Sequence, residues 1–136
     1  MIVVDTGPLY AAADASDVHH SACSKLFEHP PDRLVLPVSV VVETSFLIER
    51  HLGPAAEAGF IASLLTSVLT IEQLVPDDLA RMAELVSTYA DLPLGAVDAS
   101  VVAIAERLRA TTLLSLDHRH FTVVRPSHTA AFTLLP

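Results

Sequence analysis

Two acidic residues fall on the apolar faces of helices that the sequence predicts. Glu43 follows Val40 by three residues and precedes Phe46 by three, so the 3.6-residue period of a helix places its carboxylate on an apolar stripe. Asp98 is likewise flanked by apolar residues three and four positions away. An unpaired carboxylate that leaves water costs several kcal/mol, roughly, unless a cation compensates for it. Both positions therefore indicate a site that binds positive charge.

Two further acids end apolar segments that are typical of buried strands. Asp5 follows residues 2–4, and Asp117 follows residues 113–116, which read Leu-Leu-Ser-Leu. In a parallel sheet the carboxyl ends of the strands share one edge, and ligand sites lie outside that edge. The two helical acids are predicted in first turns that begin at the same edge, where the helix dipole favours a carboxylate. We therefore expect all four acids to converge on one crevice.

The composition supplies few cations to neutralise such a crevice. The chain has 8 Lys and Arg against 16 Asp and Glu, for a formal net charge of −8, which argues against a broad basic surface. Clustered carboxylates repel one another, whereas Mg²⁺ and Mn²⁺ select oxygen ligands and keep them ionised. With one cysteine and seven scattered histidines, the chain shows no zinc-ligand spacing. The cluster predicts a divalent metal site suited to phosphodiester hydrolysis by a metal-activated water.

Strand and helix patterns alternate along the chain. Strands are predicted at residues 2–5, 34–36, 69–73 and 112–116, with weaker terminal strands at 122–124 and 132–135. Six helices are expected between them. The first is a short helix after Gly7-Pro8, and the second is capped by Ser16 or Asp17 and ends near Phe27. The third is capped by Ser39 and ends at Gly53, the fourth ends at about Ser67, the fifth runs from Asp77 to Tyr89, and the sixth carries Asp98. Right-handed crossovers between these units predict the α/β class, as a three-layer α/β/α sandwich with a mainly parallel central sheet.

Size and composition favour a single domain, residues 1–136. Hydrophobic residues make up 51% of the chain and charged residues 18%, which suffices for a sizeable core. The longest uncharged run, 58–71, is shorter than the ~20 apolar residues of a spanning helix. No basic leader precedes the first strand. We therefore expect a cytoplasmic protein without a membrane span.

Four segments carry the acids, and in chain order they read VVDTGPLYAAADASDVHH, PVSVVVETSFLI, LPLGAVDASVVAIAERL and LLSLDHRHF. Together they resemble the PIN-domain ribonucleases, and more narrowly the bacterial VapC-type toxins. The resemblance covers essentially the whole chain. A strand that ends in Asp is common, but four motifs in the right order make the combination specific, and they imply a PIN-like fold.

By that resemblance, four acids bind Mg²⁺, or Mn²⁺ in its place, and are the catalytic residues of an endoribonuclease: Asp5, Glu43, Asp98 and Asp117. Thr6 matches the hydroxyl residue that follows the family's first acid. Ser115 stands where the family usually has Thr and keeps the hydroxyl. Both hydroxyls are expected to support the site.

Residues 118–120 are predicted in a loop over the site, and Arg119 is expected to contact a phosphate or the leaving group.

The resemblance further implies the toxin of a type II toxin–antitoxin pair. A cognate VapB-type antitoxin would cover the nuclease, and the free toxin would inhibit translation by cleaving structured RNA. The family's targets are transfer RNA or the ribosomal sarcin-ricin loop, and the sequence leaves both open. We expect a homodimer or a hetero-oligomer with the antitoxin.

Other functions of similar α/β proteins fit the sequence less well. A phosphoacceptor receiver domain needs a lysine late in the chain, and the only lysine is Lys25. A phosphatase with an Asp nucleophile needs Asp-x-Asp after the first strand, where this chain has Asp5-Thr6-Gly7. The alternatives left open are a PIN-like binding module without catalysis and an RNA-processing nuclease without an antitoxin.

Overall fold

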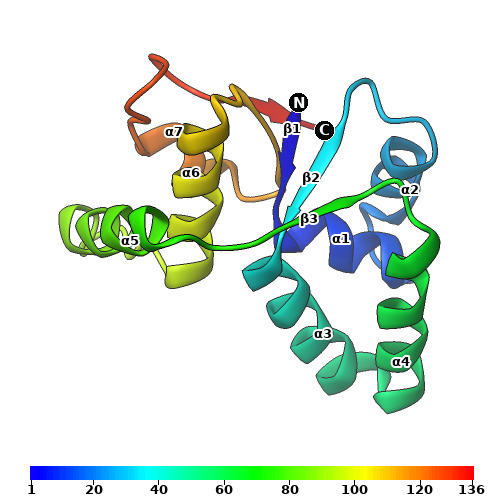
Figure 1. Ribbon diagram of the computed structural model, residues 1–136. Coiled ribbons are helices and arrows are strands. Elements are labelled where there is room, and N and C mark those ends of the chain that lie inside the picture. The colour runs from blue at the N-terminus through cyan, green and yellow to red at the C-terminus, as the bar shows by residue number, and fades with distance from the viewer.

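The computed structural model describes residues 1–136 and is built around a five-stranded sheet (Figure 1). The strands lie in the order β3-β2-β1-β4-β5, and every neighbouring pair is parallel. Their bounds are β1 (Ile2–Val4), β2 (Leu34–Pro37), β3 (Thr70–Glu72), β4 (Thr112–Leu114) and β5 (Thr133–Leu135). The predicted α/β class is confirmed, and the sheet is parallel throughout.

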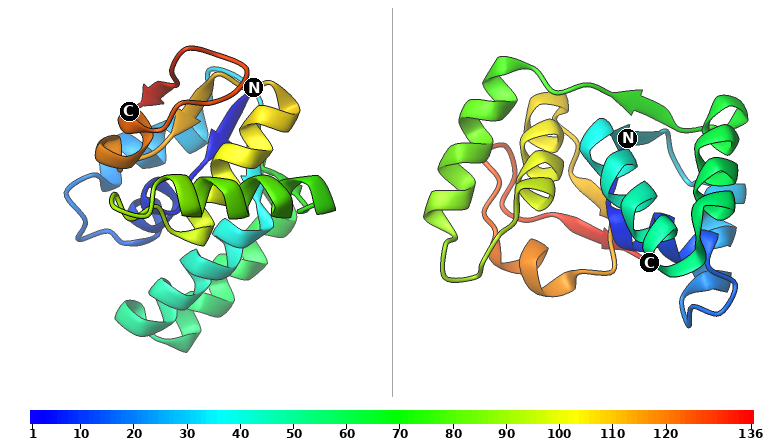
Figure 2. Two further views of the ribbon diagram at one scale, coloured as in Figure 1. Left: turned by 90° about the vertical axis from the view of Figure 1, so that its left-hand side faces the viewer. Right: turned by 90° about the horizontal axis from the view of Figure 1, so that it is seen from below.

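Helices cover both sides of the sheet (Figure 2). Their bounds are α1 (Thr6–Ala13), α2 (His20–Glu28), α3 (Val38–Leu52), α4 (Pro54–Ser63), α5 (Pro76–Thr88), α6 (Ala96–Leu108) and α7 (His118–Val123), with a 3₁₀ turn η1 (Leu64–Thr66) after α4. Helices α1 to α4 lie on one side, and α5 to α7 lie on the other (Figure 1). None of these helices has both the length and the apolar character needed to cross a membrane.

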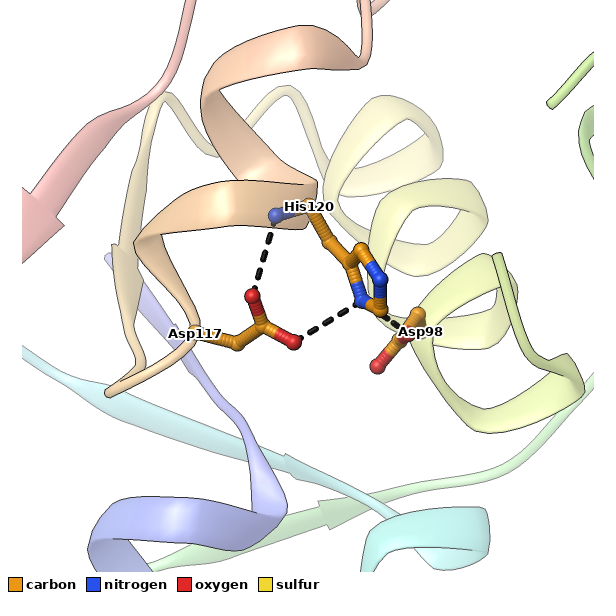
Figure 3. Close-up of side chains that lie close together, drawn as sticks. All are labelled: Asp98, Asp117 and His120. Atoms are coloured by element: carbon orange, nitrogen blue, oxygen red, sulfur yellow. Dashed lines mark hydrogen bonds and ion pairs between the residues drawn. The ribbon is translucent and has the colours of Figure 1, made fainter. Parts of the chain in front are cut away.

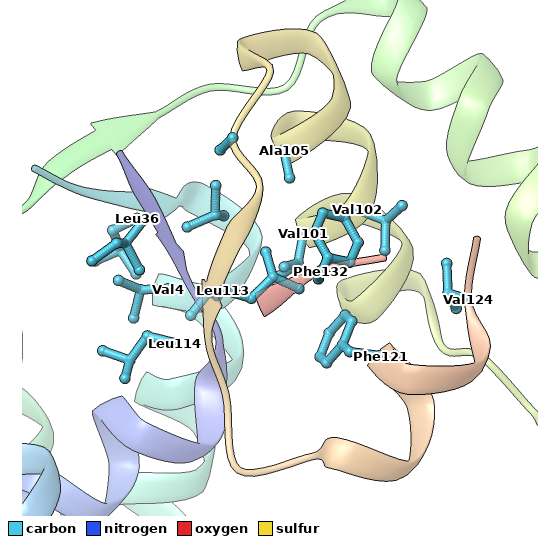
Figure 4. Close-up of a cluster of buried hydrophobic side chains, with 14 of the residues drawn as sticks. Val4, Leu36, Val101, Val102, Ala105, Leu113, Leu114, Phe121, Val124 and Phe132 are labelled. Atoms are coloured by element: carbon cyan, nitrogen blue, oxygen red, sulfur yellow. The ribbon is translucent and has the colours of Figure 1, made fainter. Parts of the chain in front are cut away.

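The core lies between the inner strands and α6 (Figure 4). Val3, Val4 and Leu113 have no exposed surface. Because β1 and β4 are inner strands with helices over both faces, they are continuous apolar runs and not alternating ones. Helix α6 buries seven consecutive residues, Ala99–Ala105. Asp98 immediately precedes this stretch, so the core fixes the helix that carries it.

The predicted terminal strand at residues 122–124 is wrong, because this segment belongs to α7 and the loop after it. The Asp117 carboxylate accepts a hydrogen bond from the His120 N–H and so caps the helix. Phe121 and Val124, three residues apart, are both buried. The β-branched residues of this segment favour a strand locally, but the cap and the helical spacing of the two buried side chains decide the structure.

Two predicted helix starts are also wrong by a few residues. Helix α3 begins directly after β2, and Ser39 does not cap it. The Ser39 hydroxyl lies 2.6 Å from the Ser100 hydroxyl of α6 and ties the two helices together. Helix α2 begins at His20 and not directly after Asp17, whose carboxylate accepts a hydrogen bond in the preceding turn. In both cases a polar side chain finds its partner outside the helix start that its residue type suggests.

Candidate active site

The four acids singled out in the sequence line one cavity of about 660 Å³. Asp5 follows β1 and Asp117 lies beyond the end of β4, so both stand at the carboxyl edge of the sheet. Asp98 lies in the first turn of α6, as predicted. Glu43 lies in the second turn of its helix and not, as predicted, in the first, because α3 already begins at Val38. The fold therefore brings together acids that are more than 100 residues apart in the sequence.

Asp5 is the most deeply buried of the four acids, with 5% of its surface exposed. Its N–H donates to the Leu114 carbonyl oxygen at 2.9 Å, which continues the pairing of β1 with β4. The Ser115 hydroxyl donates to Asp5 Oδ2 at 2.7 Å. Burial raises the pKa of Asp5 to about 6, and the hydrogen bond from Ser115 offsets only part of that rise. A cation in the cavity would stabilise this carboxylate.

Thr6 connects the end of β1 to the acid of α3. Its hydroxyl donates to Glu43 Oε2 at 2.6 Å.

Val40 and Ile48 of α3 are fully buried, whereas Phe46 is 57% exposed. The prediction of an apolar core stripe through Phe46 is therefore wrong, because α3 packs chiefly against α1 and α4 and extends beyond the sheet (Figure 1).

Asp98, Asp117 and His120 form the second half of the site (Figure 3). His120 Nδ1 lies 3.0 Å from Asp98 Oδ2 and 2.8 Å from Asp117 Oδ2. Asp117 Oδ1 accepts the His120 N–H at 2.9 Å, so both oxygens of this carboxylate contact the same residue. Burial raises the pKa of Asp98, His120 opposes the rise, and the neighbouring Asp117 carboxylate adds to it.

The donor set fits a hard divalent cation. One oxygen each of Asp98 and Asp117 and a ring nitrogen of His120 lie within 4.8 Å of one another. None of the four acids that line the cavity forms an ion pair with Arg or Lys. Arg81 and Arg107 pair instead with acids of α5, α6 and β3. Carboxylate-rich sets select ions such as Mg²⁺ and Mn²⁺. The structure thus provides an acidic cluster that can bind a metal ion.

His120 is the residue whose position the sequence analysis missed. Residues 118–120 begin α7 and do not form the predicted loop, and the helix turns the His120 ring onto the acids. His120 follows Asp117 by three residues, which is about one helical turn. This spacing predicts that the two side chains meet only if Asp117 is recognised as the cap of a helix. Arg119 is exposed and lines the cavity, where it can reach a substrate phosphate.

Ser115 supports the acids from outside the cavity lining. Its side chain is fully buried, donates to Asp5 and accepts the Asp117 N–H at 2.9 Å. We expect Ser115→Ala to lower the free energy of unfolding by about 1–3 kcal/mol, because these buried groups lose their partner. We also expect it to weaken metal binding by about 10- to 100-fold. Thermal unfolding and calorimetric metal titration measure both effects.

Ser115→Thr is the matched control, because threonine keeps the hydroxyl. We expect its metal affinity to stay near that of the wild type. If Ser115→Ala binds metal as tightly as the wild type, the hydroxyl does not position the acids.

A second large cavity lies apart from the acids. It has a volume of about 600 Å³, and ten of its 13 lining residues are hydrophobic, including Leu9, Ile48 and Phe60. It shares no lining residue with the acidic cavity and contains no titratable side chain. This apolar cavity therefore offers no carboxylate, histidine or cysteine that could bind a metal ion.

Comparison with known proteins adds three findings. The sequence profile of a family described as PIN domain matches residues 2–125. The chain is 32% identical to Ribonuclease VapC26 of Mycobacterium tuberculosis over 135 residues, which cover 99% of this chain and 100% of that protein. The fold matches the crystal structure of VapC20 of M. tuberculosis, described as a sarcin-ricin loop cleaving toxin, with a TM-score of 0.80. That match has 24% identity and covers 87% of this chain and 91% of the other.

Proposed function

Because the chain belongs to the PIN domain family, we propose that it is a divalent-metal-dependent endoribonuclease that hydrolyses phosphodiester bonds in structured RNA. The observation that carries this proposal is the single cavity lined by four carboxylates, none of which forms an ion pair with Arg or Lys. A relative that matches over its whole length is named a ribonuclease, which supports the reaction type. We take the chain, residues 1–136, as one PIN domain that acts in the cytoplasm.

The side chains of the cavity have distinct proposed roles. The proposed catalytic and metal-binding acids are Asp5, Glu43, Asp98 and Asp117. The proposed ion is Mg²⁺, with Mn²⁺ as the alternative, and when bound it supplies charge stabilisation at a phosphate and lowers the pKa of a water. Thr6 orients Glu43 and Ser115 orients Asp5 through hydrogen bonds. Arg119 is the proposed phosphate contact.

The target and the partner of the nuclease are proposed from its relatives. VapC20 is described as cleaving the sarcin-ricin loop, so this loop and transfer RNA are the first substrates to test. We propose that a VapB-type antitoxin binds and inhibits the protein, that the free protein inhibits translation, and that it forms a homodimer or a hetero-oligomer with the antitoxin. The cavity's excess of carboxylates would attract a basic segment of such an antitoxin.

The deciding experiment is cleavage of total bacterial RNA by the purified protein, with Mg²⁺, with Mn²⁺ and with EDTA. Discrete products that require metal support the proposed nuclease, and mapping of their ends identifies the target. Absence of both cleavage and calorimetric metal binding contradicts the proposal and leaves a PIN-like binding module. Cleavage of RNA precursors without translation arrest would instead favour an RNA-processing nuclease.

Arg119 provides a separate test of substrate contact. We expect Arg119→Ala to lower kcat/KM for RNA by about 10- to 100-fold, since a charge-assisted hydrogen bond contributes about 1.5–3 kcal/mol. Metal affinity should change little, because Arg119 makes no ion pair with the acids. The matched control is Arg33→Ala, which removes an exposed arginine just before β2, at the opposite edge of the sheet. Unchanged cleavage by Arg119→Ala would exclude the contact.

A further inference from the structure

His120 contacts two of the acids but does not line the cavity that the acids form. Its side chain is 18% exposed, and its ring lies beside the carboxylates of Asp98 and Asp117 (Figure 3). A ring in this position can act on the acids without touching reactants in the cavity. We propose that His120 is a positioning residue that holds the Asp98 and Asp117 carboxylates together for binding of one metal ion: its Nδ1–H donates to Asp98 and its backbone N–H donates to Asp117. This inference rests on the proposed metal-dependent function.

The hydrogen bonds of the site form a continuous chain from Asp5 to Asp98, and His120 is the last link before Asp98. The Asp117 N–H donates to Ser115 Oγ, which in turn donates to Asp5 Oδ2. His120 then connects the other two carboxylates, because its backbone N–H donates to Asp117 Oδ1 and its Nδ1 donates to Asp98 Oδ2. Asp5 and Asp117 come from adjacent strand ends, whereas Asp98 comes from α6. Among the hydrogen bonds of the site, the one from His120 joins the α6 acid to the strand acids.

The local backbone explains why the His120 ring is fixed in this position. Its own N–H donates to Asp117 Oδ1 while its ring contacts Oδ2 of the same carboxylate. The next residue, Phe121, is buried in the core and anchors α7 (Figure 4). The cap and the core packing therefore hold the backbone of His120 beside Asp117, within reach of both carboxylates.

The donor at Nδ1 compensates for the repulsion between two carboxylates. Nδ1 carries hydrogen both in the imidazolium and in one neutral tautomer, so it can donate in either form. Without a donor between them, the Asp98 and Asp117 carboxylates would repel and separate in the metal-free protein. Groups that orient metal ligands through hydrogen bonds typically change metal affinity by about 10- to 100-fold. An effect of this size is expected for His120.

The experiment compares Mn²⁺ binding by the wild type and three variants, with calorimetry as the readout. His120→Leu removes the donor, whereas His120→Asn places an amide N–H where Nδ1 was. His29→Leu is the matched control, because His29 is an exposed histidine just after α2 that does not line the acidic cavity. We expect Mn²⁺ affinity to fall about 10- to 100-fold in His120→Leu. We expect it to be largely restored in His120→Asn and unchanged in His29→Leu.

Pulsed electron paramagnetic resonance of Mn²⁺ bound to the wild type provides a test that needs no variant. A positioning residue gives no nitrogen coupling to the ion. A nitrogen coupling that disappears in His120→Asn would make His120 a metal ligand and overturn the proposal, while the proposed nuclease function would stand. Unchanged affinity in a folded His120→Leu protein would also overturn it. Absence of Mn²⁺ binding by the wild type would overturn this proposal and the proposed function together.

Discussion

Asp5→Asn is expected to remove nearly all RNA cleavage, with kcat/KM lower by about 10²- to 10⁴-fold. A metal ion contributes several kcal/mol of charge stabilisation in a phosphodiester transition state, and about 1.4 kcal/mol corresponds to a factor of ten in rate. Asn has nearly the shape of Asp and keeps an oxygen that accepts the Ser115 hydrogen bond. The substitution therefore removes the negative charge of the residue while the surrounding packing remains.

The measurement is the rate of cleavage of an RNA substrate identified from the wild-type products, at saturating Mg²⁺ and at saturating Mn²⁺. Asp77→Asn is the matched control, because Asp77 is an exposed acid of α5 that does not line the acidic cavity. The control should cleave as fast as the wild type. If Asp5→Asn retained wild-type activity, Asp5 would be no more than a strand-end residue and the assignment of the site would fail.

The fold could be predicted from the sequence because its inner elements are locally consistent. The continuous apolar runs of β1 and β4 indicate strands covered on both faces. Asp5 directly follows β1 and Asp117 lies three residues beyond β4, so both stand at the carboxyl edge of the sheet. The acids follow from the same pattern, since a charged residue at the edge of a buried segment stands out against apolar neighbours. The sequence was less informative at the periphery, where the start of α7 was predicted as a loop, its end as a strand and Phe46 as a core residue.

The contacts that complete the site depend on distant residues, which a one-dimensional pattern does not show. The Ser115 hydrogen bond to Asp5 joins residues 110 positions apart, and the hydroxyls of Ser39 and Ser100 meet across two helices. The sequence analysis placed His120 in a loop with its neighbours. Its contact with the acids could not be predicted, because that contact depends on α7 being a helix. A helix of six residues gives little periodicity to detect, and its cap is an acid that the sequence analysis assigned to the metal site.

The buried carboxyl of Asp5 should make the metal-free protein less stable as pH rises from about 4 to about 6. Burial raises the pKa of Asp5 from 3.8 to about 6. In this pH window the folded protein keeps a proton on Asp5 that the unfolded chain has lost, so the free energy of unfolding falls as pH rises. A shift of about two pKa units corresponds to a loss of about 3 kcal/mol, complete above pH of about 6.

Asp5→Asn isolates this contribution from that of the other carboxyls, such as Glu106, whose pKa is lowered by its Arg81 partner against the opposing effect of burial. Denaturant unfolding in EDTA should give the variant and the wild type nearly equal stability at pH 4. At pH 7 the variant should be more stable by up to about 3 kcal/mol. A stability difference that does not depend on pH would show that Asp5 is not buried as a charged group.

Metal should reverse the order of the two proteins at neutral pH. An ion at about 1,000 times its Kd stabilises the folded wild type by about 4.1 kcal/mol, which exceeds the cost of about 3 kcal/mol for the buried Asp5 charge. Asp5→Asn should gain much less from the same ion, because it has lost one of the proposed ligands. The charge that destabilises the empty site is thus the charge that binds the ion, which is the relation between stability and activity expected of a site built for metal-dependent catalysis.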